Sequence, residues 1–210
     1  MKTKQFIVLG TPRGGTSLVA GTLIGMGVYM GTFHSNQYED EQFKQLCAKG
    51  ASRKDFKEYF EYNDNKFYAW GCKLPNSIYF FRRFYKCLTN PHFIIIYRDP
   101  DLNAKSALKH DNRAPGKLPS VLNHVKRHNK LIERAQKRTE RAELPLLVLN
   151  LEDCQEDLQL FTNRMKEFAG LPEAPEPNNT LLHGFLQPDG GYNRIFEDHQ
   201  DKLNYFYKNA

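Results

Sequence analysis

Short uncharged apolar runs recur along the chain, separated by longer stretches with helical periodicity. Continuous apolar runs of this length are typical of strands buried on both faces of a parallel sheet. The clearest is FIIIY, which is rich in β-branched residues and carries no charge. The predicted strands are residues 6–9, 67–72, 93–97 and 146–151.

Amphipathic segments lie between these runs. Residues 16–26 place Leu18, Val19, Leu23 and Ile24 on one apolar stripe, which predicts a helix after the first strand. Because strands and helices alternate, we expect a single α/β domain over residues 1–210, with a mainly parallel sheet flanked by helices as in P-loop nucleoside triphosphatases. The other predicted helices are residues 78–88, 101–110, 121–141, 157–169 and 197–208, and residues 36–61 are polar and helical in character.

The charge balance narrows the class of ligand. The chain has 210 residues, of which 40% are hydrophobic, and it carries 30 Lys and Arg against 24 Asp and Glu, a net charge of +6. This composition is that of a globular protein and excludes a disordered one. The positive charge favours anionic ligands such as nucleotides, nucleic acid or acidic glycans, although a mildly basic surface alone gives the same balance.

Cysteine spacing and the N-terminal apolar run bear on location. Cys47, Cys72, Cys87 and Cys154 show neither a CxxC spacing nor a His at zinc-finger distance, which favours reduced thiols. The first apolar run is too short for a signal peptide or a membrane span. We therefore expect a cytoplasmic protein without a membrane anchor.

The segment GTPRGGTS, after the first strand, follows the P-loop pattern GxxxxGK[ST] in all but one position. Gly10 and Gly15 have the required spacing and Ser17 supplies the final hydroxyl, but Thr16 replaces the lysine and a positive charge appears at Arg13. Glycines let backbone N–H groups converge on one anion, and the next helix points its positive end at it. The segment predicts a phosphate site that does not hydrolyse ATP or GTP; the alternative is a turn that only connects strand and helix.

A second anion site is predicted after FIIIY, which runs directly into Arg98. Ligands of open α/β sheets bind at the carboxyl ends of strands, so Arg98 is expected beside the ligand of the first loop. A nucleoside triphosphatase would often have an acidic residue here to help hold magnesium, so arginine favours a second phosphate over a metal. Ser106 follows about two helical turns later. The alternative for Arg98 is a salt bridge to Asp99 or Asp101.

Two predicted phosphate sites that lack both the P-loop lysine and an aspartate to hold magnesium resemble those of the sulfotransferases that use 3′-phosphoadenosine 5′-phosphosulfate (PAPS). GTPRGGTSLVAGTL resembles the 5′-phosphosulfate loop of that family, and IIIYRDPDLNAKS resembles its 3′-phosphate motif. AWGCKLP and LNLEDCQEDLQLFTNRMKEFAGLP are similar to stretches of bacterial members. Gly14 departs from the usual serine, and residues 34–66 and 110–140 match little.

The resemblance implies a sulfotransferase that uses PAPS, releases 3′,5′-adenosine bisphosphate (PAP) and needs no metal. In the late glycine-rich segment of the chain, an ordinary Gly-Gly turn is the alternative to a loop over the cofactor. The cofactor-binding residues that the resemblance implies are Arg13, Gly14, Gly15, Thr16 and Ser17 at the 5′-phosphosulfate, Arg98 and Ser106 at the 3′-phosphate, and Gly191 and Arg194 in the late loop.

Sulfuryl transfer needs a cation where charge builds on the leaving phosphate and a base for the proton of the acceptor. Arg13 and Lys73 are the candidate cations. The stretch QYEDEQF is similar to a segment that follows the first helix in bacterial members, and it makes Glu39 the favoured base, with Asp40 and His34 as alternatives. These carboxylates would equally suit a solvated helix start.

Two other functions stay open on the sequence: a P-loop nucleotide or small-molecule kinase, and a non-catalytic nucleotide-binding module. For the sulfotransferase, the acceptor is expected to be a hydroxyl or amine of a small molecule or glycan, with nucleic acid not expected. The basic helix 121–141 would attract an acidic glycan or simply face solvent. The sequence fixes neither the acceptor nor the oligomeric state.

Overall fold

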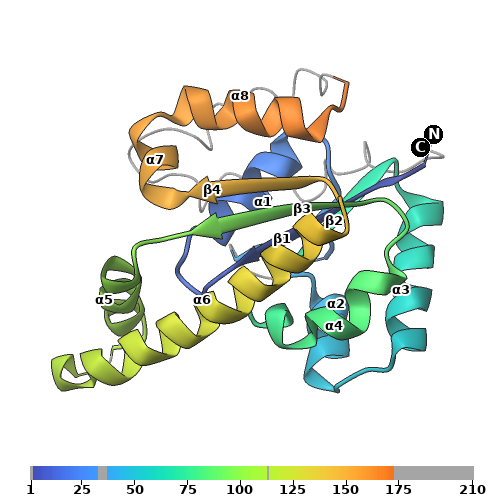
Figure 1. Cartoon of the computed structure of the whole chain (residues 1–210). Coiled ribbons are helices and arrows are strands. Elements are labelled where there is room, and N and C mark those ends of the chain that lie inside the picture. The colour runs from blue at the N-terminus through green and yellow to red at the C-terminus, as the bar shows by residue number, and fades with distance from the viewer. Residues whose placement is uncertain (1, 33–36, 113, 173–210) are drawn as a thin grey trace.

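A four-stranded parallel sheet forms the centre of the structure, a computed structural model that describes residues 2–32, 37–112 and 114–172 (Figure 1). The strands are β1 (Lys4–Gly10), β2 (Ala69–Lys73), β3 (Pro91–Tyr97) and β4 (Leu146–Asn150). They lie in the order β2-β1-β3-β4, and each neighbouring pair is parallel. This arrangement confirms the α/β class with a mainly parallel sheet.

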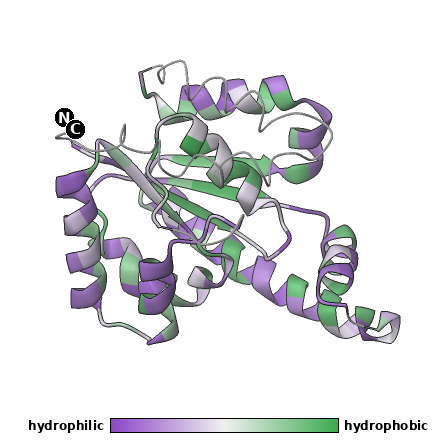
Figure 2. Ribbon diagram, turned by 180° about the vertical axis from the view of Figure 1, so that it is seen from behind, coloured by the Kyte–Doolittle hydropathy of each residue, from purple (hydrophilic) through white to green (hydrophobic). Residues whose placement is uncertain are grey.

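Helices cover both faces of the sheet. They are α1 (Thr16–Gly25), α2 (Glu41–Ala48), α3 (Arg53–Lys66), α4 (Phe81–Phe84), α5 (Pro100–His110), α6 (Leu118–Arg141), α7 (Leu151–Glu156) and α8 (Leu158–Ala169). In Figure 1, α1, α7 and α8 lie over one face, whereas α6 crosses the other and α2, α3 and α4 gather beside it. Figure 2 shows hydrophobic colour along the strands and much hydrophilic colour on the outer helices.

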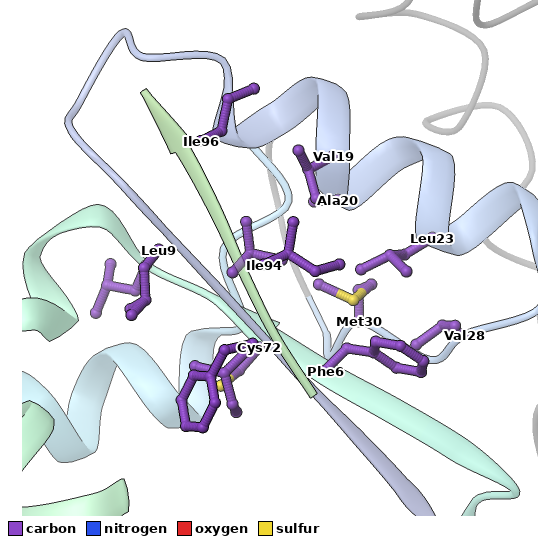
Figure 3. Close-up of a cluster of buried hydrophobic side chains, with 14 of the residues drawn as sticks. Phe6, Leu9, Val19, Ala20, Leu23, Val28, Met30, Cys72, Ile94 and Ile96 are labelled. Carbon is purple, nitrogen blue, oxygen red and sulfur yellow. The ribbon is translucent and has the colours of Figure 1, made fainter. Parts of the chain in front are cut away.

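The strand side chains are buried because helices pack on both faces. Phe6, Leu9 and residues 93–96 are fully buried. Figure 3 shows Ile94 on the side where Leu23 of α1 lies, whereas Leu9 points to the opposite side of the sheet. This two-sided burial explains why the strands appear in the sequence as continuous apolar runs rather than as alternating ones.

The structure divides one predicted helical segment and overturns another helix prediction. The segment predicted as polar and helical over 36–61 holds α2 and most of α3, because Gly50, with φ 63°, lies in the break between them and Ser52 begins α3 with a capping box. A single helix over 78–88 is wrong: a 3-10 helix (Pro75–Phe80), the four-residue α4 and a second 3-10 helix (Tyr85–Cys87) occupy this region. Phe84 of α4 packs there on Phe43 and Phe56, so aromatic packing sets the local conformation.

Helix α6 begins at Leu118, earlier than predicted, because Pro119 fits the first turn of a helix, where no N–H is needed. Within residues 2–32, 37–112 and 114–172, none of the helices combines the length and the apolar character of a bilayer span. The helix predicted over 197–208 lies outside the described residues.

The carboxyl ends of β1 and β3 form a topological switch point. The chain leaves β1 toward β2 at one edge of the sheet and leaves β3 toward β4 at the other. Ligands of open α/β sheets bind at such a point. Helix α5 and the first turns of α6 project beyond this end of the sheet (Figure 1), held together by Ala104, Val121 and Val125.

Candidate active site

The loop between β1 and α1 has the backbone of an anion site. Gly15 has φ 91°, and a Cβ there would lie 2.7 Å from Cδ1 of Leu151, so the position requires glycine. The N–H of Gly14 donates to the carbonyl of Thr11 at 2.9 Å and closes the turn. Among the described residues no side chain caps α1, and its first turn holds no acidic residue. The N–H groups at the positive end of a helix attract anions.

Arg13 occupies a strained position in this loop. Its φ is 63°, in the left-handed region that is costly for a residue with a Cβ, and its side chain is exposed. Strain of this kind persists where the surroundings over-determine it, most often at ligand sites. Here the carbonyl of Arg13 accepts a hydrogen bond from Nη1 of Arg98 at 2.8 Å.

Arg98 follows β3 and joins the two predicted phosphate segments through this bond to Arg13. Its Nε lies 3.8 Å from Oε1 of Glu152, at the start of α7. The alternative partner Asp99 instead caps α5, accepting from the N–H groups of Asp101 and Leu102. The structure therefore brings Arg98 to the P-loop-like segment, with Glu152 as its acidic neighbour.

Lys73 and Glu39 form an ion pair at the carboxyl end of β2. Lys73 is 2% exposed, and its Nζ lies 3.4 Å from Oε1 of Glu39. Burial lowers the pKa of Lys73 to about 8; Glu39 opposes this shift and the charge of Arg13 adds to it. The two candidate cations and the favoured base therefore lie in one electrostatic cluster beside the loop.

Asp40, an alternative base, is fully engaged in the fold. Its carboxylate caps α2 by accepting from the N–H of Phe43, and it also accepts from the N–H of Thr32 at 2.9 Å and the hydroxyl of Tyr59 at 3.1 Å. Burial raises its pKa, and these hydrogen bonds oppose the rise. The contacts favour the helix-start role for Asp40, which places its neighbour Glu39 against Lys73.

Asp40→Ala is expected to lower the free energy of unfolding by about 2 kcal/mol, because it removes a helix cap and leaves buried donors unpaired. Urea denaturation of the two proteins measures the loss. Asp55→Ala is the matched control, since Asp55 belongs to the exposed capping box of α3 and should cost less, about 1 kcal/mol. An equal or smaller loss for Asp40→Ala would contradict the structural role of Asp40.

The remaining predicted residues are placed with fewer contacts. Oγ of Ser17 donates to the carbonyl of Gln37 at 3.4 Å, and Thr16 is buried beside Gly10. Ser106 lies half-buried on α5, two turns beyond Arg98. The predicted residues His34, Gly191 and Arg194 lie outside the described residues.

Two residues near the site have no role in the sequence-based prediction. Glu152 follows β4 at the same edge of the sheet as Arg98, and the rule that ligands bind at carboxyl ends of strands could have found it. Asn103, inside the second motif, is fully buried and donates to Thr11. In the described part of the chain, no group of three or more His, Cys, Asp or Glu is placed to hold a metal ion.

Comparison with known proteins gives a fold but no sequence match: no protein-family model and no curated protein matches the chain. Among solved structures, the sulfotransferase domain from the curacin biosynthetic pathway has a TM-score of 0.58 at 15% identity, over 83% of this chain and 76% of that one. Sulfotransferase STF9 from Mycobacterium avium has a TM-score of 0.55 at 17% identity, over 97% of this chain and 78% of that one. Retinol dehydratase in a complex with retinol and PAP has a TM-score of 0.51 at 12% identity, over 98% of this chain and 72% of that one.

These likenesses define the class of fold. At such identities they show architecture alone, and the chain has a sulfotransferase-like α/β fold. This confirms the fold that the two sequence motifs imply.

Proposed function

We propose that the protein is a sulfotransferase that moves a sulfuryl group from PAPS to a hydroxyl or amine of a small molecule or glycan. The observation that supports it best is the contact of Arg98 with the loop 11–15, which brings a cationic side chain to an open helix N-terminus without a P-loop lysine. Two candidate anion sites joined by this contact would suit a nucleotide with phosphates at both its 5′ and 3′ positions.

The residues present fit such a nucleotide. A cradle that leaves no room for a Cβ at Gly14 or Gly15 lets backbone N–H groups approach a phosphate closely. Nε of Arg98 is buried and makes no hydrogen bond within the described residues, and the carboxylate of Glu152 lies 3.8 Å from it, so the guanidinium keeps capacity to donate to a phosphate. Arg13 and the loop backbone through Ser17 would hold the 5′ end, and Arg98 with Ser106 would hold the 3′-phosphate.

PAPS would supply the activated sulfuryl group, and the protein would supply charge and orientation. Lys73, as an ammonium, would stabilise the negative charge that grows on the leaving phosphate. Glu39 would accept the proton of the acceptor hydroxyl or amine. Their ion pair holds both groups in place beforehand, which reduces the reorganisation needed during the reaction.

Loss of the positive charge of Lys73 should limit the reaction at alkaline pH. A lysine is cationic below its pKa, so kcat is expected to fall as pH rises through about 8, the pKa to which burial lowers Lys73. Glu39→Gln removes the carboxylate that opposes this shift and should move the pKa of Lys73 lower still. The pH dependence of acetic anhydride labelling at Lys73, read by mass spectrometry, measures that shift.

Glu41→Gln is the matched control for the labelling, because Glu41 pairs with the exposed Lys44 on α2 and not with Lys73. It should leave the titration of Lys73 unchanged. An alkaline limit near 10.5, the ordinary pKa of lysine, would count against a buried catalytic ammonium.

A screen with radiolabelled PAPS tests the activity itself. Small-molecule alcohols, amines and glycans are offered in turn, and transfer of label to one of them supports the proposal. Transfer that persists in Lys73→Met and Glu39→Gln at the unmodified rate would show that this ion pair is not the catalytic centre. We also propose that the protein works in the cytoplasm, where its four free cysteines stay reduced.

A further inference from the structure

A buried asparagine links the two segments that we propose to hold phosphates. Asn103 lies on α5, one turn after the Asp99 cap, and is 0% exposed. Its Nδ2 donates to Oγ1 of Thr11, the residue that follows β1, at 2.6 Å. Thr11 is itself 2% exposed. The helix after the second motif is thus attached to the first residue of the loop.

This asparagine is poorly satisfied as a structural residue. Its Oδ1 is buried and has no hydrogen-bond partner within residues 2–32, 37–112 and 114–172. A buried amide oxygen without a donor destabilises a fold, and an apolar side chain would avoid that cost. Residues that break a local rule in this way are expected at functional sites.

The same pair of side chains fills the space beside the loop. A Cβ at Gly14 would lie 2.6 Å from Oγ1 of Thr11 and 3.3 Å from Nδ2 of Asn103. The turn that the N–H of Gly14 closes onto the carbonyl of Thr11 is therefore packed directly against α5. Gly14, which departs from the serine usual in the resemblance above, leaves room for this contact.

Two tethers consequently connect the loop to the segment after β3. One is the bond from Nη1 of Arg98 to the carbonyl of Arg13, and the other is the bond from Asn103 to Thr11. They hold the loop at two points, one on each side of Pro12. A loop held at two points keeps a fixed distance and direction relative to Arg98.

We infer that Asn103 is a positioning residue that sets the spacing between the 5′-phosphate and 3′-phosphate sites, through its hydrogen bond to Thr11. This inference rests on the proposed function. A ligand that carries both phosphates gains from a fixed spacing, because its second phosphate binds without a further loss of freedom. A ligand with one phosphate gains little from it.

The test compares three ligands by calorimetry, with weak ones measured by displacement of PAP. Asn103→Ala is expected to weaken PAP about tenfold, while AMP and adenosine 3′-monophosphate each change less than about threefold. Thr11→Val removes the hydroxyl at nearly constant size and should weaken PAP to the same extent. Thr11→Ser keeps a hydroxyl and should bind PAP as the unmodified protein does. The double variant should bind PAP no more weakly than either single one.

Asn63→Ala provides the matched control. Asn63 is also a buried asparagine, and its Nδ2 donates to the carbonyl of Tyr59 on α3, at 2.8 Å. This change should lower the melting temperature but leave the PAP affinity of the folded protein unaltered. A role for Asn103 in stability alone would produce the same pattern as Asn63.

Each result decides the inference. Unchanged PAP affinity in both Asn103→Ala and Thr11→Val, or equal losses for all three ligands, would overturn it while the proposed function stands. If Asn103→Ala does not fold, the comparison of Thr11→Val with Thr11→Ser decides in the same way. If the unmodified protein does not bind PAP, the proposed function fails and this inference fails with it.

Discussion

Lys73→Met is expected to lower kcat about 100- to 1000-fold, the usual cost of removing one group that stabilises transition-state charge. PAP affinity should stay within about threefold, since the proposed role of Lys73 begins only when charge develops. Methionine has a similar length and suits a position that is 2% exposed, so the fold should persist. Transfer is measured with an acceptor from the screen, or as sulfate release from PAPS where water is the acceptor.

Lys54→Met is the control for Lys73. Lys54 also pairs with a glutamate, Glu58 at 3.8 Å, but both lie exposed on α3, a helix away from the carboxyl ends of the strands (Figure 1). Its replacement should leave kcat unchanged. A kcat for Lys73→Met within about threefold of the unmodified value would mean that the buried lysine does not stabilise the transition state.

Arg98→Ala is expected to weaken PAP binding about 10- to 100-fold, the worth of charge-assisted hydrogen bonds to a phosphate. Adenosine 5′-phosphosulfate lacks the 3′-phosphate and should lose much less. Arg98→Lys should recover only part of the affinity, because lysine lacks the planar fork of arginine. Calorimetry with the two nucleotides gives the ratio of the losses.

Arg83→Ala is the control for Arg98. Nη1 of Arg83 donates to the carbonyl of Gly50 at 2.8 Å, the same kind of bond and the same length as that from Arg98 to the carbonyl of Arg13. Losing it should not alter nucleotide binding. If Arg98→Ala lost the same factor of affinity for PAP and for adenosine 5′-phosphosulfate, the 3′-phosphate role would be refuted and Arg98 would remain only a tether of the loop.

The sheet could be predicted from the sequence because its strands are buried on both faces. FIIIY has no charged position, and the run before Gly10 is equally apolar, so these continuous runs, alternating with helical segments, predict a parallel sheet. The prediction of one helix over 78–88 failed because the aromatic residues of this segment pack on side chains that are distant in sequence, such as Phe43 and Phe56. Local patterns carry no information about such contacts.

Candidate site residues could be chosen from the sequence where they follow local patterns. Gly10 ends β1, Gly15 lies in the loop that follows it, and Arg98 comes directly after β3. The pairing of Lys73 with Glu39 could not, since 34 residues separate them and only the fold brings them to 3.4 Å. The link from Asn103 to Thr11 spans 92 residues and was invisible for the same reason.

Neighbouring carboxylates show a further limit. Glu39 and Asp40 are adjacent in sequence and both were candidate bases, yet one faces Lys73 and the other caps α2. Their separation depends on the direction in which the chain enters the helix. The sequence offers both acids as candidates, and only the folded backbone distinguishes their surroundings.

Two calorimetric titrations of the unmodified protein test the central claim most directly, one with PAP in the absence of magnesium and one with Mg-ATP. The loop 11–15 and Arg98 together predict tight binding of PAP that does not depend on magnesium, and weak or no binding of Mg-ATP. Binding of Mg-ATP but not of PAP would contradict the account and indicate a P-loop kinase instead.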